Sequence, residues 1–344
     1  MKRLAVAVIG AGRIGKVHCG HILAHLPEIR LQAVADPELD ERWAAGLGIP
    51  LYTRHVQEAL EHPAIDAVII AAPTSSHVSL IEAAARAGKD IFCEKPVAFE
   101  PAPLARTVAT VRRAGVKLQV GFNRRFDPSF RQLVEGVRAG SIGEPHLVRI
   151  VDRDPQPPAL EFLAHSGGIF LDLAIHDFDM ARCLTGDEVE EVYATGAALI
   201  EPRLAELGDV DTAVTTLKLR RGGLCAIVSS RRAVTCYDQR IEVLGSKGSL
   251  AVHNRKPTST VLQTAAGVFA GHPYSWFADR YRQAFVAELR AFFAAVEDDT
   301  PPLVDGDDAL AAVRVACAAK RSCREKRPIK VAEIAAGSSL PEDS

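Results

Sequence analysis

Short apolar runs alternate with helical segments along the first third of the chain. The runs are rich in β-branched residues, and the segments between them carry apolar residues at helical spacing. Strand and helix alternating with short connections predict an α/β fold, a Rossmann doubly wound parallel sheet covered on both faces. The predicted strands are 4–9, 31–35, 67–72, 91–94 and 117–120, and the predicted helices begin near residues 13, 38, 77 and 103.

The pattern changes after Phe122. Longer runs follow in which apolar and polar residues alternate, which is typical of an antiparallel sheet with one buried face. We therefore expect a second α/β domain with a large, mostly antiparallel open sheet. The predicted division is 1–121 for the Rossmann domain, 122–333 for the second domain and 334–344 for a disordered tail; helices are predicted near 168–184, 279–297 and 307–325.

The charge balance excludes two classes of partner. The chain has 41 basic and 43 acidic residues, a formal charge of −2, so no strong field would attract nucleic acid or an anionic membrane. No apolar run reaches the roughly 18 residues of a membrane span, and the first residues lead into a strand rather than a secretory signal. We expect a cytoplasmic protein. The pair Arg231 and Arg232 lacks interleaved aromatic residues and is predicted to be a strand-edge or interface charge.

A glycine motif lies between the first predicted strand and the first helix. In VIGAGRIG, Gly10, Gly12 and Gly15 have the G-x-G-x-x-G spacing that lets a backbone approach a pyrophosphate at a helix N-terminus. Asp36 ends the second strand, 24 residues beyond Gly12, where a carboxylate can bind the adenosine ribose hydroxyls. Together they predict a bound dinucleotide over a purely structural glycine turn.

The acid after the second strand also bears on the choice of cofactor. A 2′-phosphate would face a like charge at Asp36, which favours NAD over NADP, although Arg13 could reach the 2′ position. Thr74 and Ser75 lie where the nicotinamide-side ribose should pass, and they could equally cap the next helix. The predicted NAD contacts are Gly10, Gly12, Arg13, Ile14, Asp36, Ala72, Thr74, His77, Glu94, Lys95 and Asn123.

Three residues are candidates for chemistry. Lys95 follows the fourth strand in CEKP, at the carboxyl edge where such sheets bind ligands, or it is a surface lysine before a turn. Asp172 and His176 are four apart and would project from one face of a helix; the alternative is an ordinary surface pair. A histidine that titrates near neutrality suits acceptance of a hydroxyl proton as hydride leaves.

Several motifs together resemble the Gfo/Idh/MocA family of oxidoreductases. The Glu-Lys-Pro element, combined with D-x-x-x-H in a GGxxxDxxxHDxD frame, is specific to that family. Within it, the chain is most similar to the inositol 2-dehydrogenases. The motifs are GAGRIG, AAPTSSHV, CEKP, GFNRRFDPSF, IGEPHLVRI, SGGIFLDLAIHDFDMARCLTG, GDVDTAVTTLKL, SRRAVTCYDQRIEV and RYRQAFVAELRAF.

The resemblance implies roles for these residues. His176 would be the acid/base, Asp172 its polyol-binding partner, and Lys95 the group that holds the reacting hydroxyl. Family members commonly pair through the open sheet, so a homodimer or homotetramer through the C-terminal sheet is expected. Asn123 to Arg125 could instead form an interdomain salt bridge, and Tyr237 could simply pack. The implied substrate-binding residues are Lys95, Arg124, Asp154, Asp172, His176 and Tyr237.

The expected function is oxidation of myo-inositol to its 2-ketone, scyllo-inosose, with NAD reduced to NADH. A dehydrogenase for scyllo-inositol or a pyranose sugar would use the same residues in a differently shaped pocket. The alternative of another class is a non-catalytic, NAD-binding and sugar-responsive regulator, which would not need Lys95, Asp172 and His176 together. No metal is predicted, because hydride transfer needs none and no carboxylate accompanies the histidines on the first helix.

Overall fold

The chain forms two compact units. The structure, a computed structural model, describes residues 3–334. The first unit holds the chain up to Phe126 together with Gln283–Val313, and the second holds Asp127–Arg282 and Arg314–Ile334. Residues 283–313 thus pack with the first unit, although along the sequence they fall within the expected second domain, 122–333. The predicted tail, apart from Ile334, lies outside the described residues.

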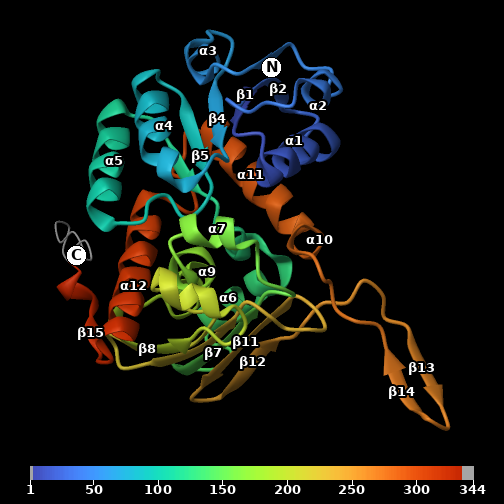
Figure 1. The fold of residues 1–344 in the computed structure, drawn as a ribbon, viewed down its shortest axis with the longest axis vertical. Coiled ribbons are helices and arrows are strands. Elements are labelled where there is room, and N and C mark those ends of the chain that lie inside the picture. Colours follow the sequence, from blue (N-terminus) through green and yellow to red (C-terminus); the bar gives the residue numbers. More distant parts are fainter. Residues whose placement is uncertain (1–2, 335–344) are drawn as a thin grey trace. The chain divides into compact units, whose positions relative to one another are not determined.

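The first unit is built on a parallel sheet of six strands (Figure 1). The strand order is β3-β2-β1-β4-β5-β6, which confirms the predicted doubly wound sheet. The order reverses between β1 and β4, so the crevice for a ligand lies at the carboxyl ends of these strands. Sequence analysis missed β3, which has only three residues. The strands are β1 (Ala5–Ile9), β2 (Arg30–Ala35), β3 (Leu51–Thr53), β4 (Ala67–Ile70), β5 (Asp90–Cys93) and β6 (Leu118–Val120).

Helices pack on this sheet and close its core. Pro101 lies at the first position of α5, and Gly115 ends that helix in the left-handed conformation, as helix termini favour. From far along the chain, α11 adds Leu289, Phe292 and Phe293 to the same buried cluster. The helices are α1 (Arg13–His25), α2 (Glu41–Ala45), α3 (Val56–Glu61), α4 (Thr74–Arg86), α5 (Pro101–Ala114), the 3₁₀ turn η1 (Asn123–Phe126) and α11 (Arg282–Glu297).

The second unit contains a seven-stranded sheet in the order β12-β11-β7-β10-β9-β8-β15. Only β7 and β10 pair in parallel, so the sheet is mostly antiparallel, as expected. The strands are β7 (Pro145–Arg153), β8 (Val189–Ala197), β9 (Thr212–Leu219), β10 (Leu224–Ser230), β11 (Asp238–Gly245), β12 (Gly248–Val252) and β15 (Ile329–Lys330).

One face of the second sheet is covered and the other is open. Along β9, Ala213, Thr215 and Leu217 are buried, while Val214 and Thr216 between them are exposed. Figure 1 shows the helices of this unit on the covered side, and a hairpin of two further strands projecting away. These elements are α6 (Pro128–Arg138), α7 (Leu160–His165), α8 (Ile169–Asp172), α9 (Ile175–Thr185), η2 (Pro202–Leu207), β13 (Val261–Thr264), β14 (Gly267–Ala270), α10 (Phe277–Arg280), α12 (Gly306–Glu325) and η3 (Val331–Glu333).

Among residues 3–334, the helices are all too short or too polar to cross a membrane.

Candidate functional site

The glycine loop has the close packing that its motif predicts. Gly10 has a φ of +97°, and a Cβ there would lie 2.6 Å from the backbone of Ala71. A Cβ on Gly15 would lie 1.9 Å from the carbonyl oxygen of Gly10, so only glycine lets α1 start this close to the loop. Gly12 precedes α1 and is different, because no atom of the described residues lies within 4 Å of a Cβ built there. The open side of Gly12 leaves room for a phosphate at the start of α1.

Asp36 lies directly against this loop. Its Oδ2 accepts a hydrogen bond from the backbone N–H of Ala11 at 2.6 Å, and its Oδ1 accepts one from Glu38 at 2.8 Å. The carboxylate is half-buried, so its remaining lone pairs still reach solvent. The structure therefore brings the acid and the glycine loop together at the carboxyl ends of β1 and β2. This is the position that binds the adenosine ribose in dinucleotide folds.

The end of β4 is joined to the end of β5 by His77. The ring is buried, and its two nitrogens lie 2.9 Å from the carbonyl oxygen of Pro96 and 2.7 Å from that of Ala72. Burial is the main cause that lowers the pKa of His77 from its ordinary value. The ring thus binds two backbone carbonyls and links the two loops, and its predicted contact with the cofactor stays a prediction. The alternative that Thr74 or Ser75 caps this helix is wrong, because the N-cap residue of α4 is Pro73 and no side chain makes a capping hydrogen bond there.

Glu94, the residue before Lys95, is bonded to the first helix. Its carboxylate is buried and its Oε1 lies 2.7 Å from Nε2 of His18 on α1. The helix that starts at the glycine loop is therefore tied to the segment that carries Lys95. Lys95 itself is half-buried, and its peptide bond to Pro96 is cis. The predicted contact of Glu94 with NAD stays a prediction beside this observed bond to His18.

Asn123 lies at the carboxyl end of β6 and is buried. Its Oδ1 has no hydrogen-bond partner among the described residues. A buried acceptor of this kind usually has a partner, so it fits a ligand that donates a hydrogen bond, as the carboxamide of a nicotinamide does. Together with the open side of Gly12 and the position of Asp36, this orphan acceptor shows that the first unit fits NAD. Arg125 pairs with Asp308 within the same unit at 2.8 Å, as the salt-bridge alternative foresaw for this segment, although not between domains.

Asp172 and His176 do not share one continuous helix. Asp172 is the last residue of α8, and His176 is the second residue of α9. Between them the N–H of Ala174 bonds the carbonyl of Ile169, five residues back, instead of the residue four back. The predicted helix near 168–184 is thus broken, and the argument from a single helical face was wrong. Both side chains are half-buried in the second unit.

A buried arginine that sequence analysis misjudged organises the acids of this unit. Arg231 follows β10 and is 1% exposed, so it is not a strand-edge charge. Its Nη1 lies 2.7 Å from Oδ2 of Asp172 and 3.5 Å from Oδ2 of Asp154. Burial alone would lower the pKa of Arg231, but the carboxylates of Asp172, Asp154 and Asp209 outweigh it and raise the pKa above its ordinary value. Asp172 and Asp154, predicted separately, therefore form one cluster on a fixed cation.

Tyr237 directly precedes β11 and is largely buried. Its ring meets that of Tyr281 edge to face, with centroids 6.0 Å apart, which agrees with the packing alternative. Arg124 is 2% exposed, so it is a core residue of η1 rather than an open surface charge. No contact of either side chain with a substrate follows from these positions, and their substrate role stays a prediction.

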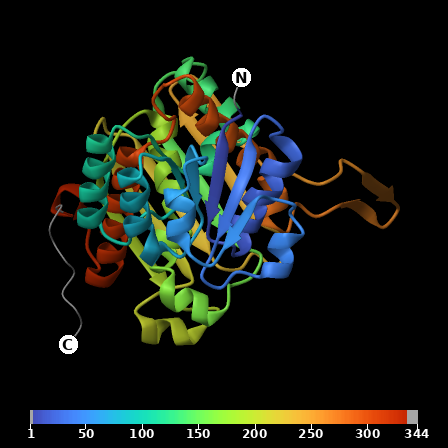
Figure 2. The same cartoon turned by 90° about the horizontal axis from the view of Figure 1, so that it is seen from above.

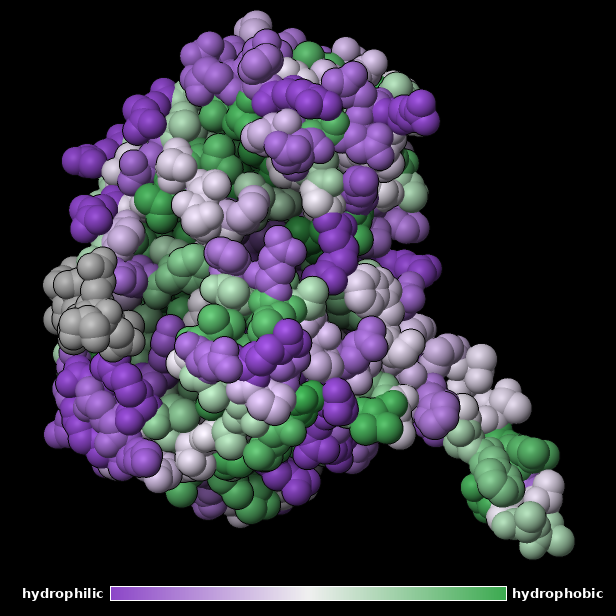
Figure 3. Space-filling model, viewed as in Figure 1, coloured by the Kyte–Doolittle hydropathy of each residue, from purple (hydrophilic) through white to green (hydrophobic). Residues whose placement is uncertain are grey.

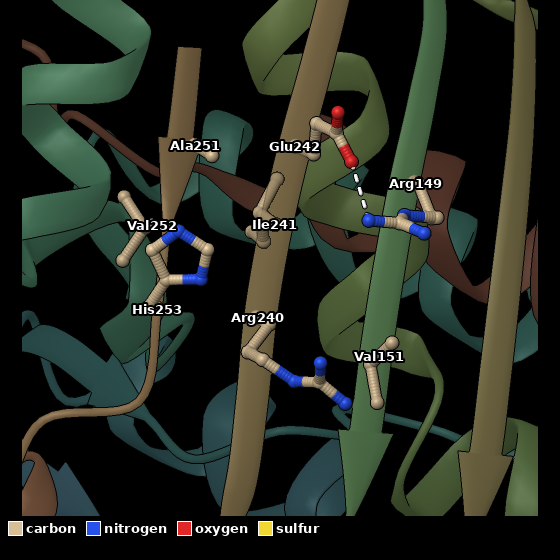
Figure 4. Close-up of a pocket in the computed structure, with 8 residues that line it drawn as sticks. All are labelled: Arg149, Val151, Arg240, Ile241, Glu242, Ala251, Val252 and His253. Carbon is tan, nitrogen blue, oxygen red and sulfur yellow. Dashed lines mark hydrogen bonds and ion pairs between the residues drawn. The ribbon is translucent and has the colours of Figure 1, made fainter.

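The structure also has a hollow of about 270 Å³ on the open face of the seven-stranded sheet (Figure 4). An ion pair between Arg149 and Glu242 lies beside it, and Arg240 and His253 line it with apolar groups of β7, β11 and β12. None of the predicted substrate residues lines this hollow. It is therefore a feature of the open sheet face and not of the candidate site.

One known family matches both parts of the chain. Residues 4–122 match the model described as an oxidoreductase family, NAD-binding Rossmann fold, and residues 134–331 match its C-terminal alpha/beta domain. The myo-inositol 2-dehydrogenase of Thermotoga maritima is 42% identical over 96% of this chain and 99% of that protein. The inositol 2-dehydrogenase of Rhizobium meliloti is 43% identical over 94% of this chain and 98% of that protein.

A solved structure agrees with these sequence relatives. The scyllo-inositol dehydrogenase from Lactobacillus casei, with bound cofactor NAD(H) and scyllo-inositol, has a TM-score of 0.91. It is 30% identical and covers 96% of this chain and 100% of its own. The chain therefore belongs to the Gfo/Idh/MocA family of oxidoreductases, with a first unit that is the family's NAD-binding Rossmann domain.

Proposed function

We propose that the chain is an NAD-dependent dehydrogenase that oxidises a secondary hydroxyl of a cyclic polyol, with myo-inositol as its first substrate. The observation that carries this proposal is the similarity, over nearly the whole chain, to proteins named as inositol 2-dehydrogenases. The polar cluster of the second unit supports it, because a polyol needs several hydrogen-bonding partners. Each buried polar group left unpaired costs about 1–3 kcal/mol, so such a cluster selects for hydroxyls.

The first unit supplies the residues that would hold NAD. The backbone at Gly10 and Gly12 would face the pyrophosphate, Asp36 the adenosine ribose, and Asn123 the nicotinamide amide. When bound, NAD supplies the acceptor for a hydride. The other proposed contacts are Arg13, Ile14, Ala72, Thr74, His77 and Glu94, of which His77 and Glu94 also link neighbouring segments of the unit.

The second unit supplies the groups for the polyol. Asp172 and Asp154 would accept hydrogen bonds from neighbouring hydroxyls, because the buried guanidinium of Arg231 lies beside both carboxylates and holds them in place. His176 would take the hydroxyl proton, and Lys95 would hold the reacting oxygen by donating from its ammonium group. The predicted reaction is the loss of a proton and a hydride from one CH–OH group, which leaves a ketone.

The test is formation of NADH by the purified chain with a panel of polyols. The panel contains myo-inositol, scyllo-inositol, other inositols, glucose and xylose, each with NAD and with NADP. We expect the highest kcat/KM with myo-inositol and NAD. A higher value for scyllo-inositol or a sugar would change the proposed substrate and keep the proposed chemistry; the Lactobacillus casei relative is named as a scyllo-inositol dehydrogenase. NAD binding without turnover of any compound in the panel would contradict the proposed enzymatic function and favour the non-catalytic, NAD-binding regulator.

The cofactor preference gives a separate prediction. Replacing Asp36 by serine removes the charge that opposes a 2′-phosphate and keeps a hydroxyl that can accept the N–H of Ala11. The ratio of kcat/KM with NAD to that with NADP is expected to fall by about tenfold or more, because like charges in contact cost several kcal/mol. Steady-state kinetics with both cofactors measure it.

Asp40 provides a matched control for this substitution. It caps α2 by accepting the N–H groups of Arg42 and Trp43, and serine caps helices about as well. Asp40→Ser should therefore leave the cofactor ratio unchanged. An unchanged ratio in Asp36→Ser as well would remove the electrostatic argument for NAD.

The open face of the seven-stranded sheet supports self-association. It exposes large apolar side chains from five strands, and exposed apolar patches of this kind mark interaction surfaces. We propose that the chain forms a homodimer or homotetramer through this face, and that it works in the cytoplasm with the cellular pool of NAD. The exposed residues are Leu147, Tyr193, Val214, Leu224 and Leu244.

A further inference from the structure

A glutamate of α11 is completely buried. Glu288 is 0% exposed, and neither of its carboxylate oxygens accepts a hydrogen bond from a described residue. Hydrophilic residues, coloured purple, cover much of the surface in Figure 3, and an acid is almost never fully buried unless it is paired. The next residue, Leu289, belongs to the buried apolar cluster of the first unit. Glu288 thus occupies a position where an unpaired charge is costly.

Polar residues of two strands lie next to this glutamate. Phe92 of β5 pairs with Gln119 of β6, and Glu94 and Gly121 follow two residues later on the same face. A Cβ on Gly121 would lie 3.1 Å from Oε2 of Glu94, so this carboxylate covers that face. Nε2 of Gln119 donates to the backbone carbonyl of Glu288 at 2.8 Å. The helix α11 therefore packs on the same face, and Figures 1 and 2 show it in orange among the blue and teal elements of the start of the chain.

His18 of α1 completes a buried polar layer, which comprises His18, Glu94, Gln119 and Glu288. Its Nε2 lies 2.7 Å from Oε1 of Glu94, and its ring meets that of Phe285 edge to face, with centroids 5.9 Å apart. Phe285 comes three residues before Glu288, so the two side chains are neighbours on α11. Among the described residues, Nδ1 of His18 has no hydrogen-bond partner. The histidine is thus bonded to Glu94 and not to Glu288.

The surroundings of Glu288 disfavour its ionised form. Burial is the larger cause that raises the pKa of Glu288 well above its ordinary value, and the negative charge of Glu94 raises it further. The ionisable groups that α1 presents on this side are His18, which is bonded to Glu94, and His21, whose ring stacks on Phe285. β6 has no ionisable residue. The other charged residues of α11 are exposed, namely Arg282, Arg290 and Glu297.

We infer that Glu288 keeps a proton in the folded protein at neutral pH and donates it in a hydrogen bond to the carboxylate of Glu94. A charged acceptor makes such a hydrogen bond strong. Glu94 is then held from two helices, by His18 of α1 and by Glu288 of α11, and it directly precedes Lys95. Glu288 is thus a positioning residue, because it acts on Lys95 only through Glu94. The role at Lys95 rests on the proposed function, whereas the proton on Glu288 does not.

The proton is tested by urea unfolding of the full-length protein and its Glu288→Gln variant at several pH values. Trp43 of the first unit is the reporter, in a Trp276→Phe background that removes the chain's other tryptophan. An acid whose pKa is raised by folding stabilises the folded state at low pH, and this stabilisation is lost as the pH rises toward the raised pKa. In an unfolded chain glutamate ionises near about pH 4.3, whereas glutamine never ionises. Between about pH 5 and 7, the unfolding constant of the parent divided by that of the variant should therefore rise about tenfold per pH unit.

Glu297 provides the matched control, since it is an exposed acid at the end of the same helix. For Glu297→Gln the same ratio should change by less than about twofold over this range, because an exposed acid titrates alike in the folded and unfolded states. A ratio for Glu288→Gln that stays constant between about pH 5 and 7 would show that Glu288 is ionised in the folded protein. That result would overturn the proposal.

The positioning of Glu94 is tested with Glu288→Met, which keeps the length of the side chain without a donor. We expect kcat/KM for the polyol to fall by at least about tenfold, because a hydrogen bond to a charged group is lost. Glu288→Gln has an amide that can donate, so it should recover most of this loss. The unfolding constants of Glu288→Met, Glu94→Gln and the double variant should show a coupling of at least about fivefold.

Two results would contradict this positioning role. They are equal losses of kcat/KM in Glu288→Met and Glu288→Gln, and additive effects of the Glu288→Met and Glu94→Gln substitutions on unfolding. If wild type turns over no polyol, the proposed function fails, and the unfolding measurements still decide the inference about Glu288.

Discussion

Replacing His176 by alanine is expected to lower kcat for polyol oxidation by about 10²–10⁴-fold, the usual contribution of a positioned general base. The alanine cannot accept the hydroxyl proton, and the half-buried position leaves water as a poor substitute. The Kd for NAD should stay unchanged, since the residue lies in the second unit and the glycine loop in the first. Initial rates and a titration with NAD measure both quantities.

The pH dependence separates a catalytic from a structural effect. A histidine acts as a general base only in its neutral form, so wild-type kcat/KM should fall at low pH. The small remaining activity of the variant should not show this decrease at low pH. His25, an exposed histidine of α1, provides a control, and His25→Ala should turn over at the wild-type rate. Unchanged turnover in His176→Ala would rule out its role as the base.

Replacing Arg231 by methionine is expected to weaken both the fold and the site. Removing one partner from a buried ion pair costs about 3–5 kcal/mol. The free energy of unfolding should fall by about 3 kcal/mol, the lower end of this range. The carboxylate side chains of Asp172 and Asp154 are 16% and 18% exposed, so both still reach some water. The KM for the polyol should rise at least about tenfold, which corresponds to about 1.4 kcal/mol. Urea unfolding and steady-state kinetics measure the two effects.

Two further variants show whether Arg231 positions the acids or only fills space. Arg231→Lys keeps the charge without the forked geometry, so it should restore part of the polyol KM. Arg232 is the exposed neighbour, and Arg232→Met should change the free energy of unfolding by less than about 0.5 kcal/mol. A KM that stays at the wild-type value in Arg231→Met would contradict a positioning role.

Much of the fold could be predicted from local sequence patterns. The features that were not predicted depend mostly on contacts between residues distant in sequence. Alternation of β-branched runs and helices suffices for the parallel sheet, and polar alternation suffices for the second sheet. Among the three residues of β3 only Thr53 is buried, so no apolar run marks this strand, whereas β6 has the same length and is buried throughout. The return of α11 to the first unit depends on Leu289 and Phe292 fitting a core made by the first residues of the chain, which no local pattern records.

The candidate site shows the same division. The glycine loop and Asp36 were predictable, because their chemistry depends on spacing along the chain. The arginine beside the acids was not, because Arg231 and Arg232 differ only in which side of the chain after β10 faces the interior. The break between α8 and α9 was also hidden, since the bond from Ala174 to Ile169 leaves the sequence period of the segment intact.

The split of the first unit along the chain has a consequence for synthesis. At about 5–20 residues per second, roughly ten to thirty seconds separate the completion of β6 from the appearance of Leu289. During that interval the strands β7 to β14 are made, while the hydrophobic surface that α11 will cover stays uncovered. A nascent chain in this state is a target for chaperones. The nucleotide-binding half is thus the first to leave the ribosome and among the last parts to be finished.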